Sequence, residues 1–216
     1  PIGDTTIMDR LMADADRQPE VEGHIVVSNH KFIGHFEAWL QGERYEKPVR
    51  LIDDGSSSND NRIGAVRDLL LALKPAGNAD VMVLAADNVL DFSLRGFIDF
   101  FHQKGTSLIM CHHEDSIAAL QRTGVVCLDS EQRVLLMEEK PVKPKTHWAV
   151  PPFYIYSHND FPLIRSAIDN GCGFDAPGNL AHYLCEHSVM HAWPMTGHRI
   201  DIGNLTTYER IKNMKI

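Results

Sequence analysis

Val81-Met82-Val83-Leu84-Ala85-Ala86-Asp87-Asn88 is an apolar run that ends in an acid. Residues 81–84 are typical of a buried strand, and Phe92–Phe101 predicts the helix that follows. In open α/β sheets, ligands bind beyond the carboxyl ends of the strands. A carboxylate there is well placed to hold a divalent metal against phosphate. The position alone leaves two interpretations of Asp87 open: a metal ligand, or a helix cap or turn residue.

Helices and strands are predicted to alternate around this run, which implies a mainly parallel sheet with right-handed crossovers. Helical spacing of apolar residues is found in 6–16, 32–40, 63–73 and 94–104, and strand-like runs in 23–28, 49–52 and 107–111. After residue 120, the strand-like segments have short connections, so we expect antiparallel strands there. These segments are 124–128, 134–139 and 149–156, followed by helices at 160–170 and 179–186, strands at 189–194 and 199–202, and a helix from 205.

Composition limits the class of protein. The chain has 216 residues, which suits one domain with a substantial core. Its formal net charge of −8 argues against a nucleic-acid-binding surface. No run reaches the length of a membrane span, and the first residues lack the pattern of a signal peptide. The four cysteines have no CxxC spacing and fit a reducing compartment. We therefore expect a cytoplasmic protein that binds neither nucleic acid nor membrane.

Four segments, in order, resemble one family, the sugar-1-phosphate nucleotidylyltransferases. They are AADN at 85–88, TGVVCLDSEQRVLLMEEKP at 123–141, AVPPFYIYS at 149–157 and RIDIGNLTTYE at 199–209. The segments SNDNRIGAVRDL and FDAPGNL are similar to the thymidylyltransferase-like branch. The resemblance implies a Rossmann-like, three-layer α/β fold with a mixed, mainly parallel sheet flanked by helices. It also implies one domain over 1–216, with a nucleotide-binding half at 1–120 and an antiparallel sugar-binding half at 121–216.

The same resemblance implies an activity. A sugar 1-phosphate oxygen attacks the α-phosphate of a nucleoside triphosphate, pyrophosphate leaves, and an NDP-sugar forms. Positioning and charge neutralisation do most of the work in such displacements. Asp87 and Asp201 would hold Mg²⁺, and Lys140 would contact the sugar phosphate. No activated nucleophile is evident in the sequence, so no covalent intermediate is implied.

Substrate-binding residues follow from the same motifs. Glu139 and Gly124 resemble the residues that face the sugar, and Gly64 and Ala65 resemble the small pair that packs near the nucleobase. Asn88 of the AADN motif and Tyr154 of the aromatic strand complete the set of expected substrate-binding residues. Some of them also have a plainer interpretation: a turn residue for Gly124, a helix-packing pair for Gly64 and Ala65, and a surface partner of Lys140 for Glu139.

Some family features differ in this sequence. The family has a strand, a glycine-rich phosphate-binding loop and a lysine ahead of the segment that PIGDTTIMDRL resembles. We expect the chain as given to be inactive without that loop. Ala86 replaces a glycine, Pro151-Pro152 removes amide donors that could face the sugar, and Arg199 replaces an aromatic residue.

These departures leave a second function class open, a non-catalytic homologue that senses a sugar nucleotide. Transfer to an alcohol phosphate such as a choline-type acceptor is a third. A homo-oligomer is also left open.

Other clusters of metal-ligating residue types carry less weight. His112 and His113 are adjacent in a predicted strand and therefore point to opposite faces. His182 and Cys185 share a helix face but lack a second ligand pair. The acids of DDGSSSND do not have the spacing of a calcium loop.

Overall fold

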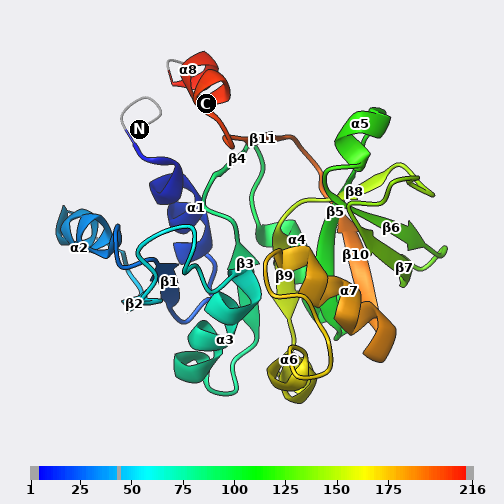
Figure 1. The fold of residues 1–216 in the computed structure, drawn as a ribbon, viewed down its shortest axis with the longest axis horizontal. Coiled ribbons are helices and arrows are strands. Elements are labelled where there is room, and N and C mark those ends of the chain that lie inside the picture. The colour runs from blue at the N-terminus through cyan, green and yellow to red at the C-terminus, as the bar shows by residue number, and fades with distance from the viewer. Residues whose placement is uncertain (1–4, 43–44, 213–216) are drawn as a thin grey trace.

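The computed structural model describes residues 5–42 and 45–212 (Figure 1). Its α-helices are α1 (Ile7–Asp16), α2 (Ile33–Gly42), α3 (Ala65–Ala76), α4 (Arg95–Lys104), α5 (Ile117–Leu120), α6 (Phe161–Ser166), α7 (Pro177–His187) and α8 (Leu205–Ile211), with a 3₁₀ turn η1 (His158–Asp160). Its strands are β1 (His24–Ser28), β2 (Val49–Asp53), β3 (Val81–Leu84), β4 (Asn88–Leu90), β5 (Ser107–His113), β6 (Gly124–Leu128), β7 (Val134–Glu139), β8 (Trp148–Val150), β9 (Phe153–Tyr156), β10 (Met190–Pro194) and β11 (Arg199–Asp201). Residues 1–4 of the segment PIGDTTIMDRL lie outside the described residues.

A mixed sheet forms the centre of the fold, as expected from the sequence, and it has seven strands (Figure 1). Its order is β3-β9-β5-β8-β6-β7, and β10 pairs with β5 on a separate branch. β10 is parallel to β5, whereas β9 is antiparallel to both β3 and β5. Parallel ladders are therefore rarer than expected. β3 and β5 point the same way, but β9, from the C-terminal half, lies between them and is antiparallel to both. β1 and β2 form a parallel pair of their own.

The segment 149–156, expected as one strand, is two strands. Pro151 and Pro152 have no N–H to donate, so the ladder is interrupted between β8 and β9. β8 pairs with β6 and the end of β5, and β9 pairs with β3 and the start of β5. The carbonyl of Pro152 accepts a hydrogen bond from the Ala85 amide at 3.2 Å. The break thus lets one segment join the two halves of the sheet.

Helices cover both faces of this sheet, which confirms the expected three layers. Along β5, side chains alternate between faces. Leu108 and Met110 pack in one buried cluster with α1 and α4, and Ile109 and Cys111 pack in another with α3, α6 and α7. Among the described helices, none is long and apolar enough to cross a membrane.

Buried Asp16 ties α1 to the strand pair. Its carboxylate accepts hydrogen bonds from His24 Nε2 at 2.9 Å and from the amides of Glu46 at 2.7 Å and Lys47 at 3.2 Å. Burial acts to raise the pKa of Asp16, but these hydrogen bonds outweigh it and hold the pKa below its ordinary value. The ammonium of Lys47 also donates to the Asp16 carbonyl.

Replacing Asp16 with Ala should lower the free energy of unfolding by about 2 kcal/mol, because three donors lose a buried acceptor. Since the folded-state pKa is lowered, the effect should persist down to about pH 4 and shrink below it. Urea unfolding of wild type and D16A at stepwise pH measures this difference. The exposed Asp169→Ala variant is the control, and an equal loss in both variants would contradict the assignment.

Candidate active site

Asp87 and Asp201 line one cavity of about 530 Å³. Asp87 lies in the turn between β3 and β4, and β4 pairs with β11 in a register that sets Asp201 opposite Asn88. The Ile202 amide also donates to the Asp87 carbonyl at 2.8 Å. Helix α4 is capped by Leu94, so the interpretation of Asp87 as a helix cap is wrong. Two exposed carboxylates distant in sequence therefore meet at one rim.

Asn88 holds the Asp87 carboxylate in place by a hydrogen bond. It is buried, at 1 % exposure, and its Nδ2 donates to Asp87 Oδ1 at 2.7 Å and to the Ala85 carbonyl at 3.2 Å. Its Oδ1 accepts a hydrogen bond from Arg199 Nη1 at 2.5 Å, and the same nitrogen is 3.4 Å from Asp201 Oδ2. The side-chain amide of Asn88 is thus hydrogen-bonded within the protein, and Arg199 lies in the cavity wall near Asp201.

Lys140 follows β7 on the other side of the same cavity. Its φ of 50° lies in the left-handed region, which is unfavourable for a residue with a side chain. Its amide donates to the Thr123 carbonyl at 3.0 Å, which holds this conformation. Within residues 5–42 and 45–212, Lys140 makes no ion pair, so Glu139 is not its salt-bridge partner. Strained backbone and an unpaired cation are features found together at ligand sites.

Glu139 lies between two glycines. The β6–β7 register sets it opposite Gly124, where an added Cβ would lie 3.2 Å from Glu139 Oε2. A Cβ on Gly178, at the start of α7, would overlap the same carboxylate and lie 2.8 Å from its Cδ. Burial raises the pKa of Glu139, and nearby Lys140 and His182 partly oppose that rise. Both glycines are therefore needed for the carboxylate to occupy this position.

Tyr154 forms part of the floor of this cavity. It is 2 % exposed and stacks on Tyr156, with ring centroids 5.6 Å apart. Burial raises the pKa of its hydroxyl. Arg122, His112 and Glu114 line the same cavity, and none of them was expected there from the sequence. Only the antiparallel arrangement of β5, β6 and β8 brings them there, so no local motif marks them.

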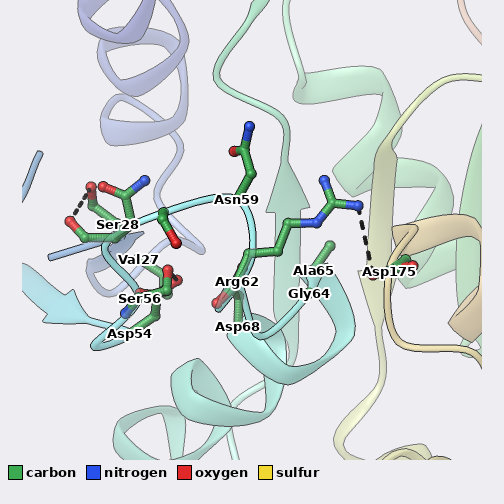
Figure 2. A pocket seen from close by; sticks show the side chains of 12 residues that line it. Val27, Ser28, Asp54, Ser56, Asn59, Arg62, Gly64, Ala65, Asp68 and Asp175 are labelled. Carbon is green, nitrogen blue, oxygen red and sulfur yellow. Dashed lines mark hydrogen bonds and ion pairs between the residues drawn. The ribbon is translucent and has the colours of Figure 1, made fainter. Parts of the chain in front are cut away.

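Gly64 and Ala65 line a different, smaller cavity of about 280 Å³ beside β1 (Figure 2). Gly64 has a φ of 93°, and an added Cβ would lie 2.5 Å from the Phe174 carbonyl oxygen. The other lining groups are mainly polar, and Arg62 reaches across to Asp175 at 3.8 Å. The two small residues thus line a cavity separate from that of the acids, and their place beside a nucleobase stays a prediction.

Asp68 lies in the wall of this smaller cavity with Asp54. Burial and the charge of Asp54 raise the pKa of Asp68 to about 6. Its Oδ1 is buried without a hydrogen-bond partner among the described residues. A proton held more tightly in the folded state means that ionising Asp68 costs stability as the pH rises.

Asp68→Asn should therefore stabilise the protein at pH 8 by about 1 kcal/mol, after allowance for solvent screening of this half-buried group. The gain should shrink as the pH falls below about 6, where the folded carboxyl takes up its proton, and vanish only below about pH 4, where the unfolded chain becomes protonated as well. Thermal unfolding across this pH range measures it. Asp175→Asn, in the same cavity but more exposed, should show no such trend, and a pH-independent effect of D68N would contradict the account.

The structure also gives the surroundings of the histidine and cysteine clusters that carried little weight in the sequence. His112 lines the larger cavity and His113 faces away, as alternation required. Burial, assisted by Arg199, lowers the pKa of His112. His182 Nδ1 bonds the Met137 carbonyl, and the Cys185 thiol lies against Met190, so both serve packing.

Gly178→Ala should displace the Glu139 carboxylate and cost about 1–3 kcal/mol of stability through overpacking. In a Glu139→Ala background the same change should cost much less, because the atoms it meets all belong to Glu139. Urea unfolding of the four proteins of this cycle gives the coupling energy. Gly34→Ala, a helical site with open space, is the control; additive effects of G178A and E139A would show that the two residues do not contact.

The chain is similar to curated proteins over part of its length. Over 130 residues, the chain is 25% identical to a glucose-1-phosphate adenylyltransferase of Fervidobacterium nodosum, covering 59% of this chain and 31% of that protein. It is 30% identical over 128 residues to a glucose-1-phosphate thymidylyltransferase of Mycolicibacterium smegmatis, covering 54% and 43%. The matches thus span less than half the length of these curated relatives.

Solved structures share the fold. A structure named as a glucose-1-phosphate thymidylyltransferase from Bacillus anthracis, in complex with sucrose, superposes with a TM-score of 0.77 at 19% identity, covering 98% of this chain and 83% of that one. An apo UDP-glucose pyrophosphorylase gives 0.74 at 15% identity, covering 96% and 87%. The nucleotidyl transferase family model matches residues 1–214. The chain belongs to the nucleotidyl transferase family.

Proposed function

We propose that this protein transfers a nucleotidyl group from a nucleoside triphosphate to a sugar 1-phosphate, giving an NDP-sugar and pyrophosphate. The observation that carries this proposal is the meeting of Asp87, Asp201, Lys140 and Glu139 around one cavity. Two acids suit a metal bound to phosphates, an unpaired lysine suits a phosphate, and a half-buried carboxylate suits sugar hydroxyls. The relatives named above support the same reaction class.

The cation we propose is Mg²⁺, held by Asp87 and Asp201. The donor set fits it, because both groups are carboxylates, which hard cations prefer. Both side chains are exposed to the cavity, and Asn88 orients one of them. When bound, Mg²⁺ would neutralise phosphate charge and draw the two anionic substrates together. Arg199, 3.4 Å from Asp201, adds positive charge to the same rim.

The chain's own residues then position the reactants. The cavity at Gly64 and Ala65 would receive the nucleobase, where their small size permits close approach. Lys140 would bind the sugar phosphate, whose oxygen attacks the α-phosphate as pyrophosphate departs. Glu139 would accept hydrogen bonds from the sugar, with Gly124 leaving room beside it and Tyr154 beneath. We propose Asn88 as a positioning residue for Asp87.

Asp87→Asn and Asp201→Asn should each reduce pyrophosphate release at least a hundredfold or so, because each removes a charge that holds the metal. The assay uses protein expressed from its complete gene, Mg²⁺, the common nucleoside triphosphates, and a panel of sugar and choline-type phosphates. Asp169→Asn is the surface control. Wild-type turnover in either active-site variant would contradict the metal assignment.

A specific observation favours a second candidate, a non-catalytic protein that binds a sugar nucleotide. Pro152 lines the larger cavity and offers no amide donor there. Calorimetry separates the two functions. Tight binding of an NDP-sugar with no pyrophosphate release from any substrate pair supports the second candidate, and turnover supports the first.

We also propose a cytoplasmic location. The four cysteines are free thiols, either buried or half-buried, which suits a reducing compartment. Assembly into a homo-oligomer stays a prediction.

A further inference from the structure

A second group of metal-ligating side chains lies outside both cavities. Ligand atoms of His113, Asp115 and His147 all lie within 4.8 Å of one another, and all three residues are exposed. His113 is the last residue of β5, Asp115 lies two residues further along the chain, and His147 immediately precedes β8. Neither histidine lines the larger cavity, so this group is distinct from the Asp87–Asp201 rim. We propose that His113, Asp115 and His147 bind a divalent transition metal of the zinc class.

Hydrogen bonding prepares His147 to act as a ligand. Its Nδ1 lies 2.8 Å from the Glu114 carbonyl, which can only accept, so Nδ1 carries the proton. In the neutral ring, Nε2 therefore keeps the lone pair that can bind a metal. An imidazole held by a backbone carbonyl through its other nitrogen is the usual arrangement of a metal-bound histidine.

Backbone hydrogen bonds join the two segments that carry His113 and His147. The Glu114 amide donates to the His147 carbonyl at 2.8 Å, in return for the bond from the His147 ring, and His113 pairs with Trp148 between β5 and β8. The rings of His113 and His147 are 5.4 Å apart and nearly parallel, and the edge of Trp148 meets His113. Two ligands thus project side by side from paired segments, where positions are better defined than on loops.

Asp115 supplies the third donor and has little competing use. Its side chain is 94% exposed, and its Oδ1 lies 3.5 Å from His113 Nδ1. Two imidazoles and one carboxylate suit zinc, cobalt, nickel or copper, whereas Mg²⁺ prefers oxygen ligands alone. Three protein ligands leave a coordination position for water.

Binding would tie the segment after β5 to the segment before β8. Glu114, between two of the ligands, lines the larger cavity, and its Oε1 accepts from the Ser116 amide at 2.7 Å. Metal at this surface would therefore stiffen one wall of the candidate active site. Metal binding by His113, Asp115 and His147 requires neither nucleotide nor sugar. A test of this metal site is therefore independent of the proposed nucleotidyl transfer.

Calorimetric titration of Zn²⁺ into the intact protein, with excess Mg²⁺ present, tests the proposal. We expect one zinc ion per chain, and at least about tenfold weaker binding in His147→Gln and in Asp115→Asn. His158→Gln is the matched control, because it disrupts an exposed His–Asp pair, with Asp80 at 2.8 Å, that lacks a second histidine. Unchanged zinc affinity in H147Q and D115N, or no zinc binding by the wild type, overturns the proposal.

Amide hydrogen exchange provides a second readout that does not depend on affinity. Zinc should slow exchange of the Glu114 amide, whose hydrogen bond to His147 joins the two segments, in the wild type and H158Q but not in H147Q. Circular dichroism of each variant establishes that it is folded. Equal slowing of the Glu114 amide in H147Q would overturn the assignment of His147 as a ligand.

Discussion

A short antiparallel ladder between β4 and β11 brings Asp201 to the same cavity rim as Asp87. It pairs Asn88 with Asp201, Val89 with Ile200 and Leu90 with Arg199. Val89 is buried in a small apolar cluster with Ile211 of α8, supported by Ile7 of α1. The C-terminal acid thus reaches Asp87 only because elements from both ends of the chain pack around this ladder. Asn88 and Arg199 then link the two acids through side-chain hydrogen bonds.

The segment before α7 organises the rest of the site. The Phe174 carbonyl accepts from the Val66 amide, and Asp175 lines the smaller cavity. The next residues, Ala176 to Gly178, line the larger one. The stretch from Asp175 to Gly178 therefore forms part of the wall of both cavities. A nucleobase in the smaller cavity and a sugar in the larger one would lie on opposite sides of this stretch. The Glu139 carboxylate fits against its end because Gly178 has no side chain.

Much of this could be predicted from the sequence, because apolar periodicity and motif order are local. The helices and most strands lie where the patterns placed them, and Asp87, Lys140 and Asp201 do share a cavity. Strand neighbours depend on pairing between distant segments, so the insertion of β9 and the three-residue β4 carried no readable signal. For the same reason, the sequence did not predict that Gly178 lies beside Glu139 or that His147 lies beside His113. Burial of Asn88 likewise depends on β11 rather than on its own motif.

Paramagnetic NMR can detect the proposed divalent cation between Asp87 and Asp201 without requiring turnover. Mn²⁺, as a stand-in for Mg²⁺, is added in substoichiometric steps to the ¹⁵N-labelled protein. The account predicts that the amide signals of Asp87, Asn88, Asp201 and Ile202 broaden first, since these residues meet at the β4–β11 rim. Broadening that starts instead around Asp54 and Asp68, with the β4–β11 signals unaffected, would contradict it.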